Sequence, residues 1–137
     1  MSLGGSEELI TARLAQARAA LEDAKFLLDA RRSPQSVINR SYYAMFYAAL
    51  ALLQRIGKTP SKHAGVISLF DTEFVIKGTF SKQLSKDFHQ AFELRQESDY
   101  KAMVAYGPEK AQDIWARAAR FVEAVGQYLQ PEAPEGT

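Results

Sequence analysis

The sequence predicts an all-α fold, an antiparallel up-and-down bundle built from five amphipathic helices. In five segments of the 137-residue chain, apolar residues recur every three or four positions, which is the spacing of one helix face. No segment alternates apolar and polar residues as a half-buried β-strand does. We expect one domain over residues 6–130, with a disordered start at 1–5 and a disordered tail at 131–137.

The first two predicted helices are long. The first is expected over about residues 6–30, with Ser6 as its N-cap. Its apolar stripe advances in steps of four and three through Ile10, Leu14, Ala17, Leu21, Ala24 and Leu28. The second is expected over about residues 34–56, with Ser33 as cap, a proline in its first turn and Gly57 at its end. It is apolar on most sides, which predicts that it lies at the centre of the bundle or also faces a partner.

Three further helices follow, joined by short links. The third is expected from a cap at Ser61 to about residue 76, and Gly78 ends it. Ser81 is the predicted cap of the fourth helix. The fifth is expected over about residues 108–129. Helices with such short links pack as antiparallel neighbours.

The fourth helix carries the most informative residue, in the stretch RQESDY at 95–100. An apolar row that starts at Leu84 continues onto Arg95, and an arginine on such a row needs a partner. In one interpretation, Arg95 is structural and pairs with Asp99 one turn later or with a residue of another helix. In the other, its planar guanidinium points into a polar cleft and holds a phosphate.

Two other stretches combine aromatic and basic residues. NRSYYAMFYAAL, at 39–50, places Arg40 and Tyr43 on a row separate from the main apolar face. That row is either part of the core or a surface for stacking or for a partner. Lys62 and His63 stand at a predicted helix N-terminus, where free backbone N–H groups favour anions. Alternatively, His63 only begins an apolar stripe as a half-buried side chain.

Charge and motifs exclude several classes of function. The chain has 17 basic and 16 acidic residues, so its net charge of +1 gives no global attraction to nucleic acid or membranes. No apolar run reaches the roughly 18 residues of a membrane span, and we expect a cytoplasmic protein. Phosphate-loop, dinucleotide-binding and zinc-protease motifs are absent. Cysteine is absent too, and neither His63 nor His89 has a full set of ligands at helical spacing, so we expect no metal and no cofactor.

Four stretches together resemble one family: NRSYYAMFYAALALL, PSKHAGVISLF, EFVIKG and AFELRQESDY. In this order and spacing, over residues 10–129, they are similar to the HEPN family (higher eukaryotes and prokaryotes nucleotide-binding), in its branch of small stand-alone prokaryotic proteins. The resemblance implies four long helices plus one short helix and a homodimer. It also implies a small nucleotidyltransferase as partner, in a toxin–antitoxin or stress system, with a nucleotide or RNA as ligand.

The resemblance also implies a site, and this chain departs from it. Many HEPN proteins are metal-independent RNases in which an Arg is followed, after four to six residues, by a His. Arg95 matches that Arg, but positions 100–102 hold Tyr, Lys and Ala. We therefore expect a binding module rather than an enzyme, with Asp99 orienting Arg95 and Tyr100 offering a hydroxyl and a ring. Two alternatives remain open: an RNase in which His63 arrives from another helix, and a purely structural dimer.

Overall fold

The computed structural model describes residues 3–100 and 106–130, and the side chains of residues 7–97 and 106–130. In these ranges the chain is helical, without strands, which confirms the predicted all-α fold. The elements are α1 (Leu3–Asp29), α2 (Pro34–Arg55), α3 (His63–Phe70), the π-helix η1 (Asp71–Val75), α4 (Lys82–Tyr100) and α5 (Pro108–Leu129). No helix among the described residues is long and apolar enough to cross a membrane.

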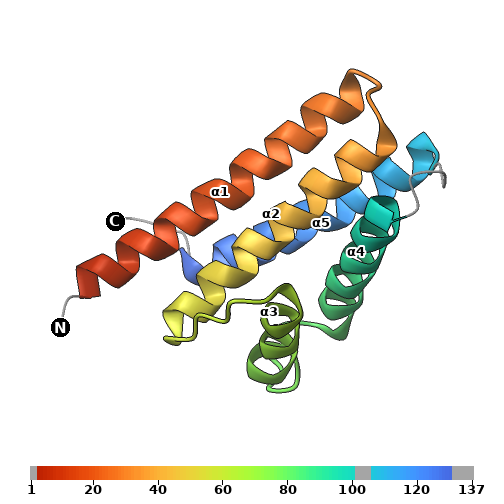
Figure 1. The fold of residues 1–137 in the computed structure, drawn as a ribbon. Coiled ribbons are helices and arrows are strands. Elements are labelled where there is room, and N and C mark those ends of the chain that lie inside the picture. The colour runs from red at the N-terminus through yellow and green to blue at the C-terminus, as the bar shows by residue number, and fades with distance from the viewer. Residues whose placement is uncertain (1–2, 101–105, 131–137) are drawn as a thin grey trace.

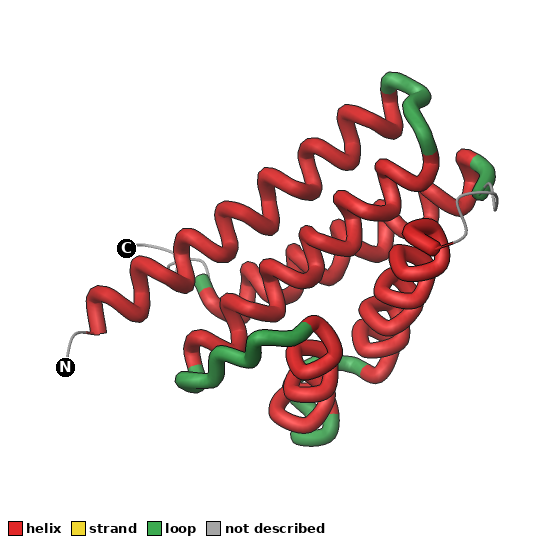
Figure 2. The backbone as a smooth tube through the Cα atoms, in the orientation of Figure 1, coloured by secondary structure: helices red, strands yellow, loops and turns green. Residues whose placement is uncertain are grey.

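Helix α2 lies at the centre of the bundle, as its apolar faces predicted. It packs against α1, α3, α4 and α5. Figure 1 shows α1 and α2 as an antiparallel hairpin with α5 running alongside α2, while α3 and α4 cover another side of α2. The described loops between the helices are short (Figure 2). This arrangement gives α2 both a buried face and a face that meets the beginning of α3 and part of α4.

The predicted signals at the ends of α2 and at the start of α4 are confirmed. The Ser33 hydroxyl oxygen accepts a hydrogen bond from the backbone N–H of Ser36 at 3.3 Å. The Ser81 hydroxyl accepts from the backbone N–H of Leu84 at 3.2 Å. Gly57 has a φ of 75°, in the left-handed region that glycine adopts without strain, so it ends α2 as expected.

Two predicted helix starts are wrong. Helix α1 begins at Leu3, so Ser6 lies inside the helix instead of capping it. The glycines before Ser6 lower helix propensity without preventing another turn. Helix α3 begins after Lys62, which takes an extended conformation and makes no side-chain cap bond, so Ser61 is not its cap. The first residue of α3, His63, lies 2.7 Å from the Tyr42 hydroxyl of α2, so the start of the helix coincides with a tertiary contact.

The third predicted helix is also not continuous. Its α-helical part ends at Phe70, and a π-turn over Asp71–Val75 follows. The Asp71 carboxylate lies against α4, where the Ser85 hydroxyl donates to it at 2.7 Å and His89 Nε2 lies 2.6 Å away. The wider turn therefore coincides with a residue that is held by the neighbouring helix.

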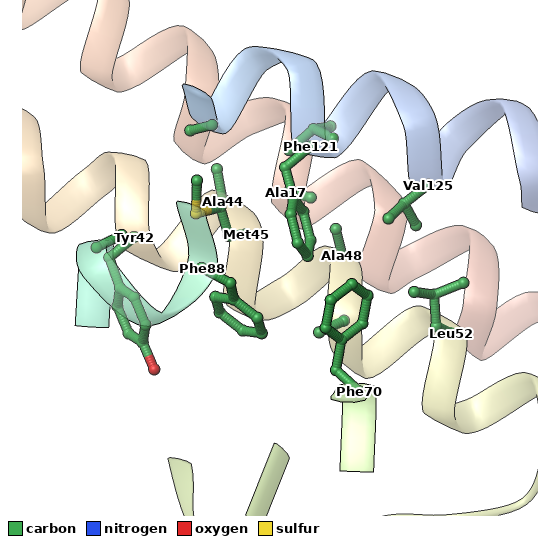
Figure 3. Close-up of a cluster of buried hydrophobic side chains, with 14 of the residues drawn as sticks. Ala17, Tyr42, Ala44, Met45, Ala48, Leu52, Phe70, Phe88, Phe121 and Val125 are labelled. Atoms are coloured by element: carbon green, nitrogen blue, oxygen red, sulfur yellow. The ribbon is translucent and has the colours of Figure 1, made fainter. Parts of the chain in front are cut away.

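The core is an aromatic cluster that reaches from α5 to α2. The rings of Phe70, Phe88 and Phe121, from α3, α4 and α5, lie with centres 5.1–5.7 Å apart. Tyr42 of α2 stacks on Phe88 at 6.1 Å. In Figure 3 the Tyr42 ring lies at the edge of this cluster, and its hydroxyl points away from the other labelled side chains. The core thus ends in a polar group whose position is fixed by packing.

One carboxylate is buried between α4 and α5. Asp87 has no exposed surface, and its Oδ1 accepts hydrogen bonds from Gln83 Nε2 at 2.9 Å and from Arg117 Nη1 at 2.7 Å. Arg117 also donates to Asp113, one turn earlier in α5, at 3.1 Å. The cluster links α4 to α5 by an ion pair at a buried position, where most helix contacts are apolar.

Candidate functional site

Three helices bring four side chains together at the polar end of the core. Tyr42 and Tyr43 come from α2, His63 is the first residue of α3, and Arg95 comes from α4. The Tyr42 hydroxyl lies 2.7 Å from His63 Nδ1. The Arg95 guanidinium lies 5.6 Å from the ring centre of Tyr42 and 5.3 Å from that of Tyr43. We call Tyr42, Tyr43, His63 and Arg95 the Arg95–His63 site.

The imidazole of His63 is fixed by aromatic rings. It stacks on Phe46 with ring centres 4.2 Å apart and an angle of 13° between the planes. Tyr42 stacks on it more distantly at 5.8 Å, and Tyr43 meets it edge-on at 5.8 Å and 89°. These contacts and the bond to Tyr42 leave the ring one orientation. His63 is therefore half-buried, as one sequence interpretation predicted, yet it also takes part in a polar cluster.

The electrostatics of the Arg95–His63 site keep two groups neutral. Burial lowers the pKa of His63 below its usual 6.5, and the positive charge of Arg95 lowers this pKa further. Burial raises the pKa of the Tyr42 phenol well above its usual 10.0, against the charge of Arg95, which lowers it. At neutral pH, His63 is thus an uncharged imidazole and Tyr42 an intact O–H.

Positive charge collects around Tyr43, a half-buried ring. The Arg40 guanidinium lies 5.1 Å from the Tyr43 ring centre, close to the 5.3 Å of Arg95. Arg40 Nε donates to the side-chain oxygen of Asn39 at 3.3 Å, which holds the guanidinium in place. Lys62 is exposed and precedes His63. A ring with cations against it suits a ligand that has both an aromatic and an anionic part.

The structure brings together most of the residues that the sequence singled out. Arg40, Tyr43, His63 and Arg95 meet in space, and Lys62 is adjacent along the chain. Asp99 and Tyr100 belong to the last turn of α4, but their side chains lie outside the described residues. The predicted pairing of Asp99 with Arg95 and the predicted part of Tyr100 therefore stay predictions.

Sequence reasoning missed the part played by Tyr42. It singled out the neighbouring Tyr43 and not Tyr42, whose ring is fully buried. Its hydroxyl nevertheless reaches His63, 21 positions later in the chain. The available signal was chemical: a buried tyrosine in a core of phenylalanines needs a hydrogen-bond partner for its hydroxyl.

A second polar cluster lies where η1 meets α4. Asp71 accepts from Ser85 and bonds His89, and nothing in the sequence linked these residues. Among the side chains that the structure describes, no three of His, Asp or Glu are grouped so as to hold a metal ion.

Comparison with known proteins gives the family. The model of the HEPN domain matches residues 10–128. A UPF0332 protein of Thermotoga maritima is 38% identical over 124 residues, which cover 90% of this chain and 93% of that protein. A protein of Methanocaldococcus jannaschii named "Putative toxin MJ0605" is 32% identical over 123 residues, 90% of each chain. These matches confirm the resemblance drawn from the sequence stretches, and the chain belongs to the HEPN domain family.

Proposed function

We propose that this protein is a toxin-like HEPN module that binds a nucleotide or RNA through Arg95 and acts together with a small nucleotidyltransferase. The observation that carries the proposal is the position of Arg95, whose guanidinium lies against Tyr42 and Tyr43 and beside His63. An arginine that only stabilised the bundle would need no second cation nearby, yet Arg40 lies against the same Tyr43 ring.

The chemistry of these groups fits a phosphate with an attached base. A guanidinium presents a planar set of N–H donors that matches the oxygens of a phosphate. The half-buried face of Tyr43 offers a surface on which a base stacks, a contact worth about 1–3 kcal/mol in single-stranded nucleic acid complexes. Because the net charge of the chain is only +1, binding must depend on this local concentration of charge.

The proposal extends to partners. Relatives named "Putative toxin" in Methanocaldococcus jannaschii support a place in a toxin–antitoxin pair. The family resemblance supports a small nucleotidyltransferase as the other member, and a homodimer formed through the surface of α2 or α4. Tyr47 and Leu50 of α2 are only half-buried, so each leaves some apolar surface for such a contact.

RNA cleavage is not part of the proposal, because no histidine stands at positions 100–102, where the motif that begins with Arg95 would have it. One observation favours a metal-independent RNase as a second candidate, namely that His63 of α3 lies against the same two tyrosine rings as Arg95. The two functions separate in one assay, because bound RNA stays intact in the first and is cut in the second.

The test is the binding of a fluorescently labelled single-stranded RNA and of ATP, with chelator present, to the unaltered protein and to Arg95→Ala. We expect Arg95→Ala to weaken binding of at least one ligand about tenfold or more, which is about 1.4 kcal/mol. Its melting temperature should stay within a few degrees. Arg120→Ala removes an exposed arginine of α5 and is the matched control for charge. If Arg95→Ala strongly destabilises the fold while its affinity for both ligands is unchanged, Arg95 is structural. If the unaltered protein cleaves the RNA and both Arg95→Ala and His63→Ala fail to cleave it, the protein is an RNase.

A further inference from the structure

The hydrogen bond between Tyr42 and His63 has a direction that the surroundings determine. The Tyr42 side chain is fully buried, and among the described residues His63 Nδ1 is the only hydrogen-bond partner of its hydroxyl. A buried hydroxyl proton without an acceptor is unfavourable, because the hydrogen bond that it made to water in the unfolded chain is not replaced. Tyr42 therefore donates, and Nδ1 of His63 accepts.

A neutral imidazole carries one proton, so the accepting nitrogen decides where that proton is. With Nδ1 as acceptor, the proton of His63 is on Nε2. The reverse arrangement, with Nδ1–H donating to the phenol oxygen, would leave the hydroxyl proton of Tyr42 without an acceptor among the described residues. Stacking on Phe46 fixes the plane of the imidazole, and in that plane Nδ1 faces the Tyr42 hydroxyl.

We infer that Tyr42 holds His63 as the Nε2–H tautomer, and that His63 and Arg95 together form a two-donor site for a phosphate group. The inference rests on the proposed function and names the ligand chemistry of the same site. Nε2 lies on the opposite side of the ring from Tyr42, and no described residue is hydrogen-bonded to it. The His63 ring centre and the Arg95 guanidinium both lie 5.3–5.8 Å from the ring centres of Tyr42 and Tyr43, so the two groups are neighbours around the same two rings.

This tautomer suits binding and not base catalysis. A general base must present an unprotonated nitrogen to the proton that it takes. The only lone pair of the His63 ring already accepts from Tyr42, and the outward nitrogen carries a hydrogen. A phosphate ester offers acceptors alone, so an N–H from His63 and the N–H groups of Arg95 match its oxygens. Tyr42 is a positioning residue in this arrangement, because it acts through His63.

The direct test is the tautomer itself, read from ¹⁵N chemical shifts of the imidazole in the labelled protein above pH 7. The chain has only two histidines, and a His89→Asn sample assigns them. We expect His63 to show a protonated Nε2 and an unprotonated Nδ1, and Tyr42→Phe to turn this into a mixture. A His63 with its proton on Nδ1, or the same tautomer in Tyr42→Phe, would refute the part assigned to Tyr42.

The ligand class is tested with inorganic phosphate. Added phosphate should shift the Nε2 resonance of His63 and leave that of His89, already bonded to Asp71, largely unchanged. His63→Gln keeps an N–H donor near the position of Nε2, so it should bind phosphate within about threefold of the unaltered protein. His63→Ala should lose about tenfold, as for one hydrogen bond to a charged group. Equal shifts of both histidines, or equal losses in both variants, would refute the two-donor site.

These outcomes are separate from those of the proposed function. If RNA or ATP binds through Arg95 while His63 carries its proton on Nδ1, the inference fails and the proposed function stands. If His63 has the Nε2–H tautomer and responds to phosphate but neither RNA nor ATP binds, the proposed function fails and the inference stands.

Discussion

Replacing Arg117 with methionine should destabilise the fold by about 3 kcal/mol at pH 7. Arg117 provides the charged partner of Asp87, which has no exposed surface. Methionine keeps much of the apolar stem of the arginine, so the loss comes mainly from a buried carboxylate left with one amide donor, Gln83. Breaking a buried ion pair in this way costs about 3–5 kcal/mol, and we take the lower end because the Arg117 side chain is 25% exposed.

Urea unfolding at pH 7, followed by circular dichroism, measures this loss of stability. In a thermal melt at pH 7, 3 kcal/mol corresponds to a shift of roughly 10 °C. Lys25→Met is the control, because Lys25 lies at the same 2.7 Å from Asp29 but both side chains are exposed, and its loss should cost about 1 kcal/mol or less. Adding Asp87→Asn to Arg117→Met removes the unpaired charge and should restore part of the stability. If Arg117→Met costs no more than Lys25→Met, or if Asp87→Asn restores nothing, the burial of the Asp87 charge is not the cause of the loss.

Two further predictions follow from the site and from α2. The pKa of His63 in the folded protein lies below the 6.5 of an ordinary histidine, so the unfolded chain binds a proton first as the pH falls below 6.5, and the stability of the fold should decrease there. In urea melts, His63→Gln should lack this part of the pH dependence. Arg95→Ala removes a nearby positive charge and should raise the pKa of His63. The apolar surface of α2 should support a two-fold dimer that buries about 1,200–2,000 Å² or more, and light scattering that gives a monomer at tens of micromolar would count against it.

The fold was predictable because it depends on local patterns. Apolar residues at helical spacing identified every α-helix, and the caps at Ser33 and Ser81 and the stop at Gly57 were correct to within a residue. Apart from the start of α1, the errors occurred where tertiary contacts override local signals. The start of α3 follows the contact of its first residue with Tyr42, and the π-turn coincides with the bonds from Asp71 to α4. Neither contact can be recognised from a pattern in the sequence around these residues.

The site was predictable only in part for a similar reason. Arg95 was conspicuous because it interrupts an apolar row, and Arg40 because it stands among aromatic residues. Which groups they meet depends on how three helices are placed, and helical periodicity does not fix that. Which group donates in the Tyr42–His63 hydrogen bond could not be predicted from the sequence at all, because it depends on the burial of the hydroxyl and on its distance to Nδ1.

Helix α2 connects the stability of the bundle with the chemistry of the site. Neighbouring residues on a helix point about 100° apart, so Tyr42 faces the core while Tyr43 lies at its border. The ring of Tyr42 stacks on Phe88, which in turn packs on Phe121, and its hydroxyl holds His63. Packing in the core therefore positions the group that orients the imidazole. A site built in this way needs no flexible loop to assemble it, because the contacts that fold the bundle already place Tyr42 against His63.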